Sequence, residues 1–148
     1  VLIGVFVIVL SIGFFSGLLF VGETSSVNPN GIEEQYLGNE HDEDAEVMKF
    51  KKSDQEMLSI VHSHILSMSL IFFLLGLIVS ITKLKQRVKI FLMVEPLLSV
   101  LLTFGGLYFM WTGVIWMKYI VMFSGTLMTL SFLLSVVIIL KQLFEKSP

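Results

Sequence analysis

Four long apolar stretches constrain the fold of this sequence more than any other feature. They cover about 1–22, 57–82, 90–111 and 117–140, and the third contains one acidic residue, Glu95. Roughly 20 apolar residues cross the ~30 Å hydrocarbon core of a bilayer. Because a spanning segment must satisfy its own backbone hydrogen bonds, continuous runs of this kind form helices. The sequence therefore predicts an all-α integral membrane four-helix bundle, with residues 1–148 as a single membrane domain.

The charges between these stretches predict the orientation of the bundle. The short connection 83–89 carries four basic residues, and the positive-inside rule places it in the cytoplasm. Counting spans then gives an up-down-up-down bundle with both termini cytoplasmic. We expect the first span to be retained, because it shows no small-residue cleavage site. The connection 23–56, with ten acidic residues and three lysines, falls on the outer face. An aromatic belt is expected at that face, made of Tyr108, Trp111, Trp116 and Tyr119.

The sequence lacks the motifs of the common enzyme classes. It has no cysteine, which excludes disulfides, thiolate metal sites and cysteine nucleophiles. It contains no P-loop, no dinucleotide-binding fingerprint, no H-E-x-x-H and no G-x-S-x-G. The net charge of −2 does not indicate a nucleic-acid partner. We therefore expect a non-enzymatic protein that contacts the lipid bilayer.

Two histidines near the start of the second stretch, His62 and His64, form the first candidate site. Ionisable groups inside a membrane are costly unless paired, and they are therefore functional candidates. Side chains two residues apart on a regular helix point about 160° away from each other. A single metal shared by both imidazoles would need a distorted helix, so separate sites are favoured. We expect His62 to face the bundle on an arc that it shares with Ser59, Ser63, Ser67 and Ser69.

The functional alternative for these histidines is the binding of haem b or a transition metal. His41, beside Asp42, Glu43 and Asp44 in the acidic connection, is a further candidate metal ligand. A haem with two histidine ligands needs a second histidine, and the other three apolar stretches contain none. The alternatives are an open axial position, a histidine from another subunit, or a methionine. The favoured interpretation is that the histidines bond to neighbouring helices or headgroups, and proton transfer is a further alternative. The methionines that could supply the second haem ligand are those in the outer half of the third and fourth stretches: Met110, Met117 and Met122.

The second candidate site is Glu95, which is followed by Pro96. Proline removes a backbone donor and frees a carbonyl one turn earlier, so a local kink is expected. An acid beside such a break can mark an ion or proton path. The favoured interpretation is an ion pair between Glu95 and a basic residue near the cytoplasmic end of the bundle: Lys85, Lys89 or Lys141.

Small residues in three stretches predict close helix packing. Gly13 and Gly17 form a small-xxx-small motif, Gly125 and Thr129 repeat it, and Gly105-Gly106 flattens the third helix. These patterns fit packing inside one bundle, a homo-oligomer, or contact with other membrane subunits equally well.

The acidic connection has signals of its own. Asn28-Pro29-Asn30-Gly31 predicts a turn, and Ser53 with Glu56 predicts a capping box that starts the second long helix. Ten carboxylates could bind calcium or dock a basic partner such as a cytochrome-like domain. The sequence lacks the EF-hand pattern, and the favoured interpretation is a solvated loop.

The same region carries a resemblance. The run 31–40, then Met48-Lys49-Phe50, then His62-x-His64, resembles a group of uncharacterised bacterial four-helix inner-membrane proteins with an H-x-H entering the second helix. The resemblance covers about a third of the chain. It implies a bacterial inner-membrane location for a multi-pass protein, and it implies no activity.

Three functional hypotheses follow. The first is an accessory or structural subunit of a bacterial membrane complex, of the kind found in respiratory chains. The second is a haem- or metal-binding protein that uses His62 and His64 at the outer face for electron transfer. The third is a small transporter or proton-conducting unit that uses Glu95.

Overall fold

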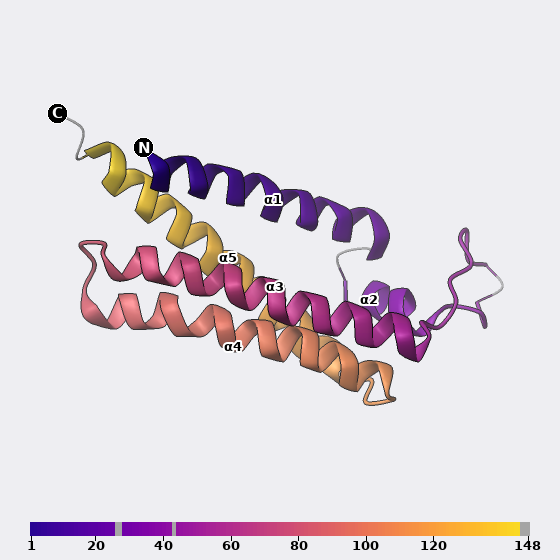
Figure 1. The fold of residues 1–148 in the computed structure, drawn as a ribbon. Helices are drawn as coiled ribbons and strands as arrows, with labels where there is room; N and C mark the ends of the chain where they lie inside the picture. The colour runs from indigo at the N-terminus through magenta and orange to yellow at the C-terminus, as the bar shows by residue number, and fades with distance from the viewer. Residues whose placement is uncertain (26–27, 43, 146–148) are drawn as a thin grey trace.

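The computed structural model describes residues 1–25, 28–42 and 44–145, and these residues form five helices and no strand (Figure 1). Four helices are long and apolar enough to cross a membrane, and one is short. Their positions agree with the four predicted stretches to within a few residues at most ends, and the predicted all-helical membrane bundle is confirmed. The long helices are α1 (Leu2–Ser25), α3 (Asp54–Ser80), α4 (Gln86–Trp111) and α5 (Met117–Glu145).

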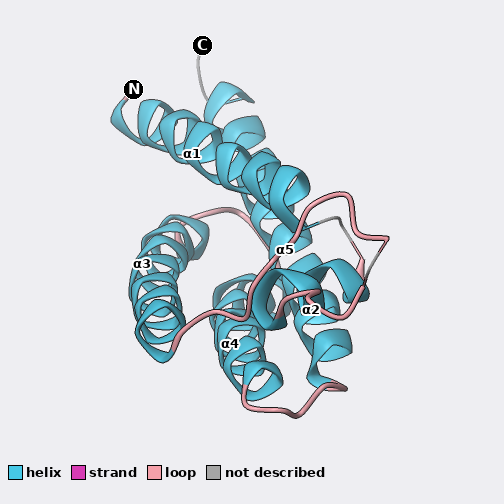
Figure 2. Ribbon diagram, turned by 90° about the vertical axis from the view of Figure 1, so that its right-hand side faces the viewer, coloured by secondary structure: helices cyan, strands magenta, loops and turns pink. Residues whose placement is uncertain are grey.

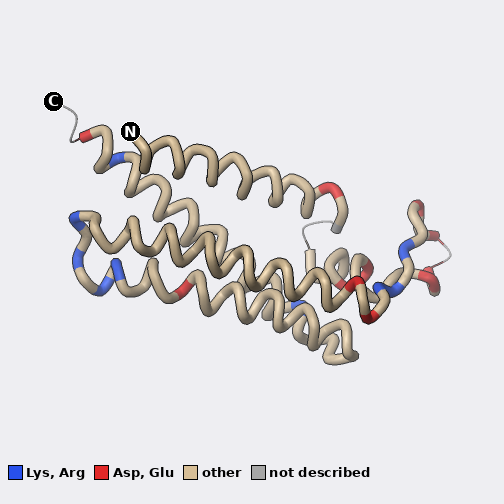
Figure 3. Tube along the Cα trace, viewed as in Figure 1, with Lys and Arg blue, Asp and Glu red and all other residues tan. Residues whose placement is uncertain are grey.

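Consecutive long helices run in opposite directions, so both termini and the α3–α4 connection lie at one end of the molecule (Figure 1). Basic residues gather in that connection, whereas most acidic residues gather at the opposite end (Figure 3). We call these the basic end and the acidic end. Placement of the basic end in the cytoplasm remains a prediction from the positive-inside rule.

Helix α4 is the centre of the bundle, because it packs along both α3 and α5, which contact each other little (Figure 2). Small residues allow the approach on both sides. Gly76 of α3 lies opposite Met93, and Gly125 of α5 lies opposite Thr103. The principal hydrophobic core lies between these helices and includes Phe72, Val100 and Phe132.

Helix α1 is the least integrated span. Only 6% of its most apolar window is buried, against 22–44% in the other three spans. Its main anchor is Phe14, whose ring stacks on Phe132 of α5 at 3.9 Å and meets Phe72 of α3 edge-on at 6.3 Å. Among the described residues the predicted small-residue motif makes no close helix contact, since a Cβ added at Gly13 or Gly17 would meet no atom within 4 Å.

The predicted turn at Asn28–Gly31 was wrong, because these residues start a helix, α2 (Pro29–Leu37). The Asn28 side chain caps it by accepting a hydrogen bond from the Gly31 N–H at 2.7 Å. Pro29 is tolerated because the first turn of a helix needs no backbone donor there. Across the acidic end, Lys118 of α5 pairs with Glu33 of α2 at 2.7 Å.

The acidic connection is more ordered than the predicted solvated loop. The predicted capping box is confirmed, because Ser53 accepts from the Glu56 N–H and the Glu56 carboxylate accepts from the Ser53 N–H. Asn39 bridges the connection: its side chain accepts from the Lys49 N–H at 2.6 Å and donates to the Val47 carbonyl at 3.0 Å.

A second cluster of buried hydrophobic residues lies at the acidic end. Its members are Met57, Leu107, Met110, Trp111 and Val121.

Candidate functional site

A line of buried polar side chains runs between α4 and α5, the two most extensively packed helices. We call this line the polar seam. In a membrane interior such groups are expensive unless they bond to one another. Every member is at most 8% exposed. The members are Glu95, Ser99 and Thr103 on α4, with Ser124, Ser131 and Ser135 on α5.

Glu95 is the only acid within α4 and lies nine residues, roughly 13 Å, from the start of that helix. Both of its carboxylate oxygens accept hydrogen bonds. Ser99, one turn along α4, donates to Oε1, and Ser131 donates to Oε2 from α5. The carboxyl group therefore links the two helices through hydroxyl groups.

The expected ion pair with lysine was wrong. Among the described residues, the salt bridges are Lys52–Glu56, Lys118–Glu33 and Lys141–Glu145, and Glu95 is in none of them. Lys89 instead donates its ammonium group to the Ser80 carbonyl at 2.9 Å. These cations lie at helix ends, where a long side chain can reach water, whereas Glu95 is two and a half turns inside its helix. The acid is thus buried without a cationic partner in the part of the chain that the structure describes.

The other hydroxyl groups of the seam differ in how they are satisfied. Thr103 Oγ1 and Ser124 Oγ bond across the two helices at 2.8 Å. Ser124 also donates to the Ile120 carbonyl at 2.7 Å. Ser135, at 1% exposure, has a hydroxyl group with no hydrogen-bond partner among the described residues.

The histidines stand apart from this seam. The prediction that this arc faces the bundle was wrong for His62, Ser59, Ser63 and Ser67, which are exposed, whereas Ser69 is half-buried. The buried face of α3 is formed instead by residues such as Phe72, Leu75 and Val79, so the packing of this helix follows its apolar side chains. The ring of His64 lies 4.8 Å from that of Phe104 of α4, and its Nδ1 bonds to the Ile60 carbonyl at 2.8 Å.

Helix α3 is continuous through both histidines, so their side chains point to different sides, as expected from the spacing. Within the described ranges, no three or more His, Asp or Glu side chains are grouped to hold a metal ion. The fold therefore gives no support to a metal shared by His62 and His64, and it adds nothing in favour of haem.

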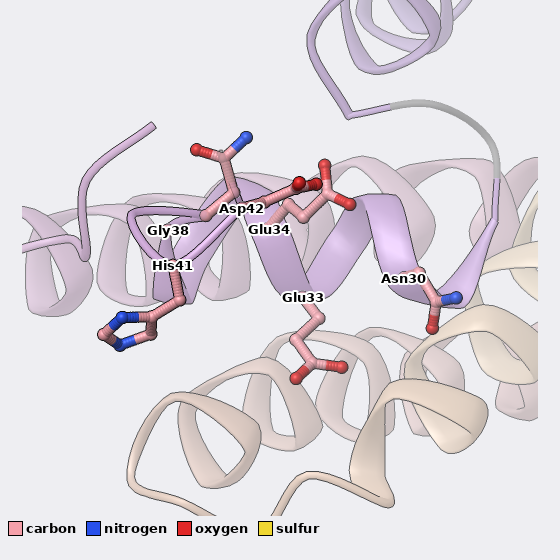
Figure 4. A pocket seen from close by; sticks show the side chains of 7 residues that line it. Asn30, Glu33, Glu34, Gly38, His41 and Asp42 are labelled. Carbon is pink, nitrogen blue, oxygen red and sulfur yellow. The ribbon is translucent and has the colours of Figure 1, made fainter. Parts of the chain in front are cut away.

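His41 lines a pocket of about 480 Å³ beside α2, together with carboxylates of the acidic connection (Figure 4). Figure 4 shows Glu33 and Glu34 pointing to opposite sides of α2, with the His41 ring turned away from both. Glu33 is already paired with Lys118. Glu43, part of the predicted metal site, lies outside the described residues. The arrangement does not bring the predicted ligands together.

Sequence reasoning identified Glu95 but missed its partners. The signal was present as spacing: Ser99 and Thr103 follow Glu95 at intervals of four, which keeps them on one helical face. On the last span, Ser124, Ser131 and Ser135 repeat at intervals of seven and four. Pairing these two faces would have predicted the seam.

Comparison with known proteins agrees with this architecture. A family model described as a transmembrane helical domain, Aq_1264_TM, matches residues 26–148. The match covers α2 to α5, including the whole polar seam, and leaves α1 outside. The searches of curated proteins and of solved structures gave no match. Because the match covers most of the chain, this multi-pass membrane protein belongs to the Aq_1264_TM family of transmembrane helical domains.

Proposed function

We propose that the chain moves protons within the membrane, with Glu95 as the group that takes up and releases them. The observation that carries this proposal is a buried carboxyl group held only by hydroxyl groups, with no cation paired to it among the described residues. A carboxyl group fixed by a lysine is locked in its charged form. One that is bound by two serines can be held in either form, since a hydroxyl group both donates and accepts.

The rest of the seam supports a route toward the acidic end. From Glu95 the hydroxyl groups recur at one-turn intervals, about 6 Å apart, at Ser99 and then at the Thr103–Ser124 pair. Single water molecules can bridge gaps of this size between polar groups. A purely structural clamp would need no hydroxyl groups beyond the two that bind the carboxylate.

The test is proton flux into vesicles that contain the purified full chain. A potassium gradient with valinomycin sets the membrane potential, and a trapped pH-sensitive dye reports the internal pH. We expect flux above that of empty vesicles, and we expect Glu95→Gln to reduce it to the empty-vesicle level. Glutamine preserves the size of the side chain and can still bond to Ser99 and Ser131, but it cannot exchange a proton.

The matched control is Glu145→Gln, which removes an exposed carboxylate at the end of α5. This variant should conduct like the wild type, and circular dichroism should show the same helix content in all three proteins. Wild-type vesicles that remain as tight as empty ones would overturn the proposal. So would full flux through Glu95→Gln.

A second proposal, independent of the first, is that the chain is a subunit of a larger assembly in a bacterial inner membrane. It is supported by α1, whose Gly13 and Gly17 present an open face to the membrane. Close backbone approach at such small-residue motifs drives helix association in lipid. A second copy of the chain is the simplest partner, because one motif can pack against its own copy.

We expect the wild-type chain in mild detergent to have the mass of a dimer or larger species by light scattering, and Gly13→Leu/Gly17→Leu to be monomeric. Leucine blocks close backbone approach without adding polarity. Gly22→Leu is the control, since it makes the same change at another open glycine of α1 and should leave the mass unchanged. A monomeric wild-type chain, or an oligomer that survives the double substitution, would contradict the assignment of this face.

A further inference from the structure

The unpartnered hydroxyl group of Ser135 requires an explanation. The side chain is 1% exposed, and its Oγ has no hydrogen-bond partner among the described residues. Buried polar groups in native proteins almost always bond to something, and an apparent exception often marks a bound water or ion. The surroundings of Ser135 therefore indicate what could occupy this part of the polar seam.

Three contacts fix the register of α4 against α5. A Cβ at Gly106 would lie 3.1 Å from Val121, Thr103 bonds to Ser124, and Glu95 bonds to Ser131. The two helices are antiparallel, so toward the basic end the residue numbers fall along α4 and rise along α5. One more turn in the same direction places Ser135 opposite Leu92, which is itself 2% exposed.

The backbone carbonyl of Leu92 also lacks its usual hydrogen-bond donor. Its carbonyl would normally accept the N–H of the residue four positions later, but that residue is Pro96, which has none. Carbonyl groups of an α-helix point toward its C-terminus, so this oxygen points from Leu92 toward the level of Glu95. By this register, the Ser135 hydroxyl group lies about one turn along α5 from the Glu95–Ser131 contact, and the Leu92 carbonyl is a second buried group without its usual donor on the neighbouring helix.

We propose that Glu95, Ser131, Ser135 and the Leu92 carbonyl form a binding site for a sodium ion. All four supply oxygen, the ligand that hard cations prefer. The site holds one carboxylate, which balances the charge of a monovalent cation, and it holds no imidazole or thiolate that would select a transition metal. Short serine side chains on closely packed helices favour the smaller sodium ion over potassium.

This proposal deepens the proposed function and rests on it, because sodium and the proton would compete for Glu95. The charged groups on the packed elements leave that carboxylate free to do so. On α4, Lys89 is bonded to the Ser80 carbonyl of α3, and Arg87 is exposed at the start of the helix. On α5, Lys118 is paired with Glu33 at the acidic end, and Lys141 is paired with Glu145. The titratable side chains of α3 lie in residues 54–64, at the acidic end, and the one acid described on α1, Glu23, is at that end too.

The test is thermal unfolding of the full chain in detergent, in sodium, potassium and choline chloride at equal ionic strength. A ligand that binds only the folded state raises the melting temperature as its concentration rises. We expect a saturable increase in sodium alone.

Glu95→Gln and Ser135→Ala should abolish or strongly weaken the sodium shift, whereas Ser135→Thr, which keeps the hydroxyl group, should retain it. Thr126→Ala is the matched control, because it removes another hydroxyl group of α5, one that bonds to the Met122 carbonyl of its own helix and lies away from the proposed ligands. Equal melting temperatures in the three salts would overturn the sodium site, as would a sodium shift that persists in Glu95→Gln. The wild-type comparison decides this even if a variant fails to fold.

The two proposals fail separately. Proton flux through wild-type vesicles without any sodium effect on melting would remove the sodium site and leave the proton function. A sodium shift that depends on Glu95, in a protein that conducts no protons, would remove the proton function and leave a cation site.

Discussion

Replacing Gly106 with leucine is expected to force α4 and α5 apart and to lower the free energy of unfolding by about 1–3 kcal/mol, the usual cost of overpacking a tight interface. Even a single Cβ at this position would lie 3.1 Å from Val121 and 3.5 Å from Met117. Val121 is 6% exposed and belongs to the cluster at the acidic end, so it has little space into which to move. The larger side chain can be accommodated only if the helices separate.

The neighbouring residue supplies the control. A Cβ at Gly105 would meet no atom within 4 Å, so Gly105→Leu makes the same change on the same helix without a clash. Leucine also has a higher helix propensity than glycine, so this variant should be as stable as the wild type or more stable. Equal stability of the two variants would contradict the close approach of α4 and α5 at Gly106.

Denaturation by sodium dodecyl sulfate, followed by tryptophan fluorescence, measures both variants. Trp111 is a suitable reporter, since it lies in the same cluster and its indole N–H donates to the Lys52 carbonyl at 2.9 Å. The Gly106 variant should also weaken proton flux, because the contact at Gly106 belongs to the register that aligns Glu95 with Ser131. Gly105→Leu should not.

The architecture was predictable from the sequence because the bilayer imposes it. A span must be long, apolar and helical, and the four stretches satisfy all three conditions at once. The capping box at Ser53 was also predictable, since it depends on two residues that are only three positions apart. Features that depend on neighbouring residues alone can therefore be predicted from the sequence.

Packing partners were less predictable, and the physical reason is the solvent. In water, apolar residues identify the face that packs, whereas in lipid both faces of a helix are apolar and the buried side is not marked. The serine arc around His62 therefore pointed to the wrong side. The spacing of hydroxyl groups marks one face of α4 and one of α5, but the register that pairs Glu95 with Ser131 depends on how the two helices pack.

The short helix α2 shows a different limit. Asn28-Pro29-Asn30-Gly31 carries residues favoured in turns, but an asparagine cap followed by proline also starts helices. The following residues decide between the two, because Ile32, Tyr36 and Leu37 place an apolar surface on the cluster at the acidic end. Burial there raises the pKa of the Tyr36 hydroxyl group. Packing against this cluster thus favours a helix over a turn at Asn28–Gly31.

Replacing Gly38 with alanine is expected to release the acidic connection from the bundle. Gly38 ends α2 with φ of 84° and ψ of 171°, a conformation that is essentially restricted to glycine and costs other residues about 1–3 kcal/mol. An added Cβ would also lie 2.8 Å from both the Lys49 carbonyl oxygen and the Lys51 nitrogen. These are backbone atoms, so they cannot move aside without breaking the Asn39 bridge that holds the connection.

The rate of trypsin cleavage measures this release, because Lys49, Lys51 and Lys52 lie in the segment that packs against Gly38. A strain of about 1–3 kcal/mol corresponds to cleavage that is about five- to 150-fold faster when opening limits access. Gly113→Ala is the control, because Gly113 also has a positive φ, 114°, but lies in the α4–α5 turn, where its added Cβ would meet nothing within 4 Å. That variant should keep the acidic connection protected. Wild-type cleavage rates in Gly38→Ala would mean that the connection is not held against α2 as the Asn39 bridge implies.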